Sequence, residues 1–161
     1  MARIGIVIVI GVIIISMAAT LYMYTQYQTN FIIANAGESV VVGPVEYRIT
    51  FDGIQKGNKE TMPVNTFVKI RIIAKNISEE KTRISGSQFY MSDEKRQKHQ
   101  SVYGGFSAED LSYYVLEPNK PVILTTQFDV PYDEQKQYNI IVRPSKQQSS
   151  VDTALICIIN C

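Results

Sequence analysis

Residues Thr66–Lys75 read TFVKIRIIAK, and this stretch predicts a β-strand with one buried face. Apolar side chains recur at every second position, as expected when successive side chains of a strand point to opposite faces. The side expected to be buried carries Val68, Ile70, Ile72 and Ala74. The side expected to face water carries Phe67, Lys69, Arg71 and Lys75, with Ile73 as an apolar exception. Such a strand needs other strands or helices to cover its apolar face, and strands are what the neighbouring sequence offers.

Short apolar or alternating runs continue to the C-terminus, and turn residues such as Gly43-Pro44 and Asp52-Gly53 end them. They predict about eight short strands in about 120 residues. Beside Thr66–Lys75, the runs are Ser39–Val42, Val45–Phe51, Thr82–Ile84, Gln88–Ser92, Tyr113–Leu116, Val122–Val130, Tyr138–Val142 and Ala154–Ile159. We therefore predict an all-β fold, an immunoglobulin-like antiparallel β-sandwich. The absence of Trp and the terminal position of both Cys residues argue against an antibody-type domain.

An uncharged segment, Ile4–Met23, precedes these strands and reads IGIVIVIGVIIISMAATLYM. At about 1.5 Å per residue, a helix of this length crosses the roughly 30 Å hydrocarbon core of a bilayer. Arg3 precedes the run and the next basic residue is Arg48, so the positive-inside rule places the N-terminus in the cytoplasm. The alternative is a cleaved signal peptide with Ser16-Met17-Ala18 as its cleavage site. The apolar run continues past this site, which favours an uncleaved signal anchor.

These observations predict a single-pass protein of the cell membrane with an extracytoplasmic domain. We expect a cytoplasmic stub at residues 1–3, a transmembrane helix at 4–24, a juxtamembrane linker at 25–38 and an exported β-sandwich at 39–161. The chain carries 16 Lys and Arg and 15 Asp and Glu, of which only Arg3 precedes Glu38. The expected domain is therefore formally neutral, which argues against a nucleic-acid partner.

The sequence offers no set of residues for catalysis. His99 is the only histidine and stands among Lys95, Arg96 and Lys98, so we expect it in a solvated loop and not in a metal site. No Ser-His-Asp arrangement can be assembled without invented partners. We therefore expect no enzyme activity, no metal and no cofactor.

The candidate contact surface is a set of aromatic residues in and after a long segment, residues 93–112. Its members are Tyr103, Phe106, Tyr113 and Tyr114. Loops of this length in a compact sandwich are often functional, and exposed aromatic residues are typical of interfaces. In the alternative, Tyr103, Phe106 and Leu111 fold back and plug one end of the sandwich.

Two further sites concern covalent chemistry. Asn76-Ile77-Ser78 is an N-glycosylation sequon on an expected turn. Cys157 and Cys161 would lie about 13 Å apart in an extended strand, beyond the roughly 7 Å limit of a disulfide. An intramolecular bridge therefore needs the chain to curl after Ile159. A buried Cys157 with a free Cys161 is the preferred interpretation, and a bond to another chain is a further alternative.

Several segments resemble the telokin-like immunoglobulin-type domain of unknown function, which occurs in exported bacterial and archaeal lipoproteins and membrane-anchored proteins. They are Val68–Ser78, Phe89–Asp93, Leu116-Glu117-Pro118 and Phe128–Pro131, and the resemblance covers about residues 40–159. Two features depart from the family: Asn119 stands where the family usually has Gly, and there is no lipobox Cys. The resemblance implies a β-sandwich with an adhesion or accessory role, and it implies no catalytic residues.

The leading functional prediction is a membrane-anchored accessory or binding subunit that acts through protein–protein contacts. Its expected partners are the membrane, through Ile4–Met23, and a protein in or on that membrane. A tether of this kind raises the effective concentration of a domain near its partner. The alternatives are a structural subunit of an envelope or filament, such as a surface-layer or pilus-like assembly, and a secreted β-sandwich if the N-terminal segment is cleaved.

Overall fold

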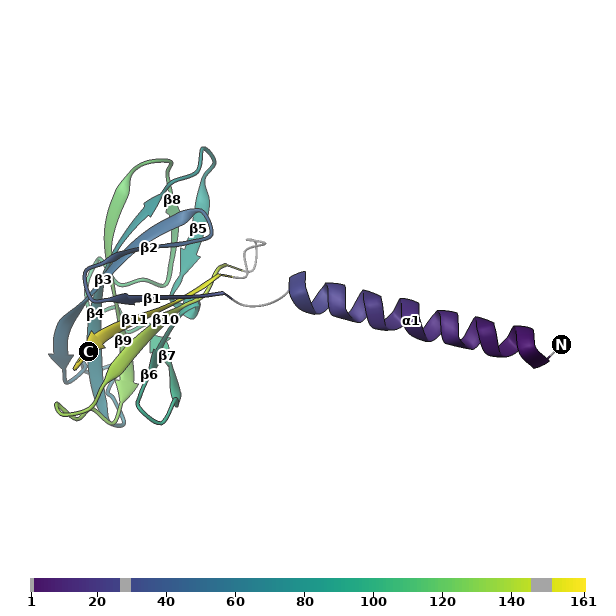
Figure 1. Ribbon diagram of the computed structural model, residues 1–161. Coiled ribbons are helices and arrows are strands. Elements are labelled where there is room, and N and C mark those ends of the chain that lie inside the picture. Colours follow the sequence, from purple (N-terminus) through teal and green to yellow (C-terminus); the bar gives the residue numbers. More distant parts are fainter. Residues whose placement is uncertain (1, 27–29, 146–151) are drawn as a thin grey trace. The chain divides into compact units, whose positions relative to one another are not determined.

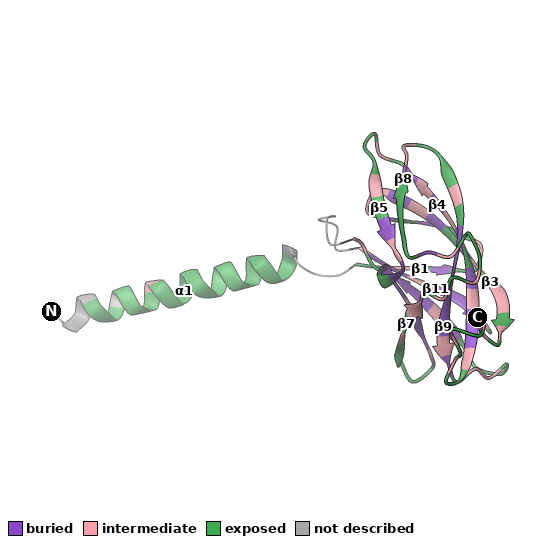
Figure 2. Cartoon of the chain, turned by 180° about the vertical axis from the view of Figure 1, so that it is seen from behind, coloured by how far each residue is buried: buried purple, intermediate pink, exposed green. Residues whose placement is uncertain are grey.

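The computed structural model describes residues 2–26, 30–145 and 152–161, and it consists of two separate units, residues 1–30 and 31–161. The first unit contains helix α1 (Ala2–Gln26). Its stretch Ile8–Thr25 is long and apolar enough to cross a membrane, with a mean hydropathy of 2.0 and no buried residue. Figure 2 colours almost all described residues of α1 as exposed.

Three hydroxyl groups within α1 hydrogen-bond to the helix itself. Ser16 donates to the Ile13 carbonyl at 2.9 Å, Thr20 donates to the Ser16 carbonyl at 2.8 Å, and Thr25 donates to the Tyr22 carbonyl at 2.9 Å. Back-bonding of this kind removes free donors from an apolar helix surface, which suits a helix that has no water to satisfy them.

The second unit is built almost wholly from strands (Figure 1). The strands are β1 (Phe31–Asn35), β2 (Ser39–Val42), β3 (Val45–Gln55), β4 (Thr66–Asn76), β5 (Thr82–Ser85), β6 (Phe89–Ser92), β7 (Lys98–Val102), β8 (Tyr113–Leu116), β9 (Pro121–Val130), β10 (Tyr138–Val142) and β11 (Thr153–Ile159). A short 3₁₀ turn, η1 (Gly86–Gln88), connects β5 to β6. The hydrogen-bonded order is β1-β11-β10-β6-β7-β9-β4-β3-β2, and β5 and β8 form a separate pair.

Strand β7 joins two layers by changing its neighbour along its length. Its first half pairs with β6, whereas Ser101 and Val102 pair with Phe128 and Gln127 of β9. The sheet curls on itself, because β11 packs against β2 and β3 from the opposite end of the strand order. The result is a sandwich or barrel-like fold around one core, to which both layers contribute (Figure 2).

The alternation that predicted β4 is confirmed. Its four inward residues are completely buried, and the long strand pairs with β3 on one side and with β9 on the other. Tyr47 of β3 lies in the same core, edge-on to the Phe89 ring at 5.7 Å. Its hydroxyl is buried and forms no hydrogen bond with any described residue. Burial raises the pKa of Tyr47 far above its usual value, and the nearby Gln88 offsets only a part of this.

Three local predictions were wrong. Residues 31–35 of the expected linker form β1, which pairs in parallel with β11 through its backbone. Asp52-Gly53 does not end β3 but forms an irregularity inside it, where Gly53 has φ +108°. Lys98–Val102 is strand β7, so His99 lies opposite Met91 in a sheet, and its buried Nε2 has no hydrogen-bond partner in the described part of the chain.

Candidate functional site

The segment that follows β7 leaves the sheet and then returns to the same strand. Beyond Val102 the chain departs from β9, and Glu109–Leu111 rejoins β9 further along. Two backbone hydrogen bonds fix the return: Leu111 N donates to the Thr125 carbonyl, and Thr125 N donates to the Glu109 carbonyl, both at 2.8 Å. Both ends of loop 103–110 are therefore held by one strand of the sandwich.

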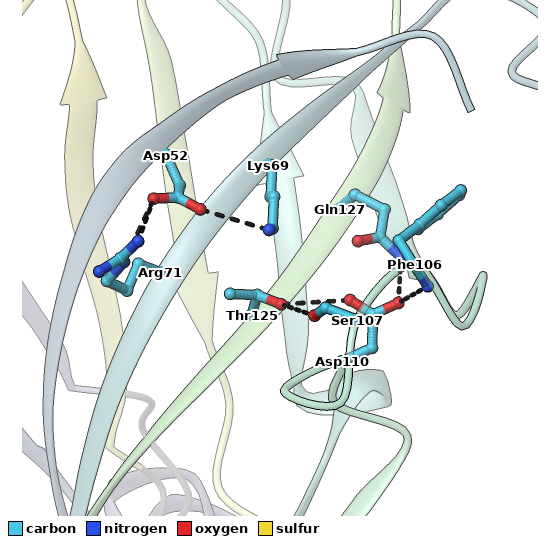
Figure 3. Close-up of polar contacts among 8 residues, drawn as sticks. All are labelled: Asp52, Lys69, Arg71, Phe106, Ser107, Asp110, Thr125 and Gln127. Carbon is cyan, nitrogen blue, oxygen red and sulfur yellow. Dashed lines mark hydrogen bonds and ion pairs between the residues drawn. The ribbon is translucent and has the colours of Figure 1, made fainter. Parts of the chain in front are cut away.

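The Asp110 carboxylate holds this loop against the outward face of β9 (Figure 3). It accepts hydrogen bonds from Phe106 N at 2.8 Å, Thr125 Oγ1 at 3.1 Å and Gln127 Nε2 at 3.4 Å. Thr125 and Gln127 point away from the core, yet each is only 1% exposed. The loop therefore forms a lid over polar residues that the strand pattern alone assigns to solvent.

Phe106 packs inward onto the sheet. Its ring meets the ring of Phe67, with centroids 5.5 Å apart and an interplanar angle of 61°. Phe67 is 1% exposed, so its predicted place on a water-facing side was wrong. The alternation correctly places Phe67 on the outward face of β4. The prediction failed because a loop covers this part of the outward face, and the strand pattern does not reveal that loop. Gly104 makes this packing possible, since a Cβ at this position would lie 2.1 Å from the Phe106 ring.

A second loop, residues 56–65, lies against the first. Asn58 Nδ2 donates to the Gly104 carbonyl at 3.2 Å. The same Asn58 organises its own loop, because its Oδ1 accepts from Glu60 N and Thr61 N. The loop is also held to β9, where the Asp129 carboxylate accepts from Val64 N at 2.7 Å and from Asn65 N at 2.9 Å.

These two loops present apolar side chains to solvent. Val64 is 91% exposed, Met62 69% and Tyr103 61%, and Ile54 at the end of β3 is also exposed. We call Ile54, Met62, Val64 and Tyr103 the two-loop surface. Exposed apolar groups held on well-ordered loops are typical of a protein interface.

A charged cluster lies next to the loop network on the same outward face. Asp52 accepts from Arg71 Nη2 at 2.9 Å and lies 3.4 Å from Lys69 Nζ (Figure 3). Lys69 and Arg71 are the register neighbours of Gln127 and Thr125 in the adjacent strand. The Asp52 and Lys69 side chains are partly buried and the Arg71 side chain is about half exposed, and the three together add one net positive charge to this face.

The structure separates the aromatic residues that were predicted to form one contact surface. Tyr103 is exposed on the loop, whereas Phe106 is packed against Phe67. Tyr113 and Tyr114 lie on β8, paired with β5, and both are exposed. The alternative holds in part, because Phe106 and Leu111 do fold back while Tyr103 does not. The sequence analysis did not identify Asp110 as the residue that holds the loop, because the sequence of a polar loop does not show which groups a carboxylate will bond.

The comparisons identify the family of the β domain. The sequence model described as a domain of unknown function, DUF4352, matches residues 34–151. The chain belongs to the DUF4352 family. The match includes both loops, Asp110 and β9, and it excludes α1 and the two cysteines. The predicted resemblance to a domain of unknown function is confirmed at this level. A comparison with curated protein sequences found no match.

Solved structures share the fold of this DUF4352 domain. The yjhA protein from Bacillus subtilis is 15% identical, with a TM-score of 0.60 over 78% of this chain and 98% of its own. A candidate lipoprotein from the same organism, ycdA, is 16% identical, with a TM-score of 0.58 over 75% of this chain and 38% of its own. The secreted protein MPT63 from Mycobacterium tuberculosis is 9% identical, with a TM-score of 0.57 over 82% of this chain and 99% of its own. At these identities the likeness concerns the fold alone.

The glycosylation prediction does not fit the structure of this DUF4352 domain. The Asn76 side chain is completely buried. Its Nδ2 donates to the Glu80 carbonyl at 2.7 Å and to the Leu116 carbonyl at 3.2 Å, while its Oδ1 accepts from Ser78. A glycan would be attached to this buried nitrogen, so Asn76 is a structural residue of the turn and not a surface acceptor.

Cys157 and Cys161 form an intramolecular disulfide, with Cα atoms 5.6 Å apart. The chain curls after Ile159 as such a bridge requires, and Asn160 adopts a positive φ of +52°. The preferred interpretation, a buried free Cys157, is therefore not what the structure contains. Asn160 also ties the curl to the β9–β10 loop, because its Nδ2 donates to the carbonyls of Glu134 and Lys136.

Cys161→Ser is expected to lower the free energy of unfolding by about 2 kcal/mol at most, because the bridge closes a loop of only a few residues. The measurement is thermal unfolding of the full chain with and without reductant. Reductant should destabilise the wild type and leave the variant unchanged. A covalent dimer of the wild type on a non-reducing gel would contradict the intramolecular bridge.

Proposed function

We propose that this chain is an exported, membrane-anchored accessory subunit whose immunoglobulin-like, telokin-type β-sandwich binds a protein partner through the two-loop surface. Residues 56–65 and 103–110 present large apolar side chains to water, while the carboxylates of Asp129 and Asp110 hold the two loops to β9. That combination is the observation on which the proposal rests. Ordered loops lose little conformational entropy on binding, which favours affinity.

Membrane attachment is supported by α1, which is long and apolar enough to span a bilayer. Two proteins of similar fold are described as a candidate lipoprotein and a secreted protein, which agrees with an exported domain. In this proposal Arg3 keeps the N-terminus in the cytoplasm. Intact-protein mass spectrometry tests it: a mass that includes Ile4–Met23 supports the anchor, and a chain that begins at Ala19 replaces it with a secreted domain.

Photo-crosslinking of the full-length protein in its own membranes tests the partner site. A photoreactive amino acid replaces Met62 or Tyr103 in the two-loop surface. Glu79 is the matched control, because it is exposed on the turn after β4 whereas the two loops adjoin the start of β4. An 11-residue strand is about 35 Å long, so the control position lies well away from the loops.

The same adduct from positions 62 and 103, absent from position 79, is expected. It should also be lost from position 62 when Tyr103→Asp is added. Crosslinks only between copies of this chain would instead favour a structural subunit of an envelope or filament. Binding without catalysis is part of the proposal, and a specific turnover abolished by His99→Ala would contradict it.

A further inference from the structure

A second candidate site shares no residue with the two-loop surface. A hollow of about 560 Å³ lies where β5, η1, β6, β8 and the end of β10 meet. Its walls include Ile84, Tyr90, Tyr113 and Pro144. This volume falls within the range of small-molecule pockets, roughly 300 to 1,000 Å³.

The charge of this hollow is wholly positive. Arg83 and Arg143 line it, and none of the described lining residues is acidic. Neither guanidinium forms an ion pair with any carboxylate of the described residues, although the nearby Lys81 pairs with Glu117 at 2.7 Å. Two unpaired guanidiniums in one concave site create a local field that attracts anions.

Each guanidinium is positioned by an aromatic ring. The Arg143 Cζ lies 4.8 Å from the centroid of the Tyr90 ring, and the Arg83 Cζ lies 6.0 Å from that of Tyr113. Contact with a ring uses the flat face of a guanidinium. The N–H groups along its edge stay free to form the paired hydrogen bonds that oxyanions accept.

The floor of the hollow is fixed by Gln88, which is buried. Its Nε2 donates to the Arg143 carbonyl and its Oε1 accepts from Ser85 N, both at 2.9 Å. A reciprocal backbone bond runs from Arg143 N to the Gln88 carbonyl at 2.9 Å. The Ser85 and Ser87 hydroxyl oxygens lie 2.8 Å apart at the same wall and add donors to the site. These bonds fix the backbone from which the Arg143 side chain and the Ser85 hydroxyl extend.

We propose that this hollow binds a phosphate monoester whose organic body is apolar and planar. Two guanidiniums supply a formal charge of +2, which matches the charge of about −1.5 to −2 on a phosphate monoester at neutral pH. A single carboxylate would leave one arginine unmatched. Ile84, Pro144 and the two tyrosines provide apolar wall for the rest of the ligand.

Calorimetric titration of the full-length chain in a non-ionic detergent tests this site with phenyl phosphate as the probe. Inorganic phosphate lacks the apolar body, and benzoate lacks the second charge. We expect phenyl phosphate to bind at least about tenfold more tightly than either. Its affinity should fall as NaCl is raised, because both arginines are exposed and screened by salt.

Variants separate this site from a general attraction to basic surface. Arg83→Gln and Arg143→Gln should each weaken phenyl phosphate binding by about tenfold or more. Arg143→Lys should weaken it less, because lysine keeps the positive charge but lacks the paired N–H groups of the guanidinium. Arg48→Gln is the control, because Arg48 is an exposed β3 residue outside this hollow. Unchanged thermal unfolding of at least one arginine variant ensures that lost binding is not lost folding.

Four outcomes would overturn the proposal. Equal affinities for phenyl phosphate and benzoate, or equal losses in Arg48→Gln and Arg143→Gln, would overturn the proposal, as would no binding at all. Glycerol 3-phosphate tests the organic body of the ligand, because glycerol is polar and not planar. Weak binding of it supports an apolar, planar ester, whereas binding as tight as that of phenyl phosphate would overturn the proposal. None of these outcomes depends on the two-loop surface.

Discussion

Asn76→Ala is expected to lower the free energy of unfolding of the β domain by about 3 kcal/mol or more, because it leaves buried backbone groups without partners. Asn76 Nδ2 satisfies the carbonyls of Glu80 and Leu116, and its Oδ1 satisfies the amide and hydroxyl of Ser78. Removing the side chain leaves a cavity where water is excluded, since Asn76 is completely buried. A loss of this size is a large part of the total stability of a small domain.

The position of Asn76 amplifies this effect. Its backbone carbonyl also accepts from Asn119 N at 2.8 Å, and Asn119 adopts a positive φ of +58°. One residue therefore joins the turn after β4 to the turn between β8 and β9. Asn76→Asp has nearly the same shape but places a carboxylate oxygen against two carbonyls, so its loss at neutral pH should be at least as large.

Thermal and denaturant unfolding of the full chain, followed by near-ultraviolet circular dichroism, measure this loss. Asn65→Ala is the matched control, because Asn65 is exposed and contributes its backbone N–H to the Asp129 contact. The control should stay within about 0.5 kcal/mol of the wild type. An Asn76→Ala variant as stable as Asn65→Ala would show that the turn finds other partners.

The sequence signals that succeeded were local. The alternation in β4 predicted which of its apolar side chains face the core, because a strand with one buried face repeats with period two. Asn119 stands where the family usually has Gly, and the structure gives it a positive φ, a conformation that both residues tolerate. These features depend only on residues that are close in the chain, so they can be predicted from a single sequence.

The predictions that failed depended on distant partners. β1 was assigned to a linker because its role depends on pairing with β11, more than 100 residues later. Phe67 was assigned to the water-facing side because its cover comes from loop 103–110. The Asn76 sequon is compatible with any turn, and only the carbonyls of Glu80 and Leu116 show that its nitrogen is used. The residue types alone cannot reveal such partners, because a solvent-exposed surface has the same pattern of polar residues.

Asp110→Ala is expected to release loop 103–110 from β9 and to lower the free energy of unfolding by about 2 to 3 kcal/mol. The change removes the acceptor of Phe106 N and leaves Thr125 Oγ1 without its carboxylate. Gln127 Nε2 keeps the Val102 carbonyl as a second acceptor, which limits the loss. Without the carboxylate, the Phe106 ring is less restrained and the buried outward face of β9 opens to water.

Hydrogen exchange measures the release directly. Exchange should accelerate at Phe106 N and at the 125–127 amides, while the amides of β10 keep their protection. Glu109→Ala is the matched control, because the Glu109 side chain is exposed while its backbone carbonyl still accepts from Thr125 N. Asp110→Asn should fall between the two, since the amide keeps one acceptor oxygen but presents a donor to the other partners.

The same variant links loop order to binding. If the two-loop surface binds a partner, Asp110→Ala should reduce crosslinking from Met62 as well as from Tyr103, because Asn58 couples the loops through the Gly104 carbonyl. Glu109→Ala should leave both crosslinks intact. A released loop with undiminished crosslinking would contradict the requirement for an ordered surface, and the exposed side chains alone would then account for binding. Reduced crosslinking without faster exchange would instead indicate that the partner contacts Asp110 itself.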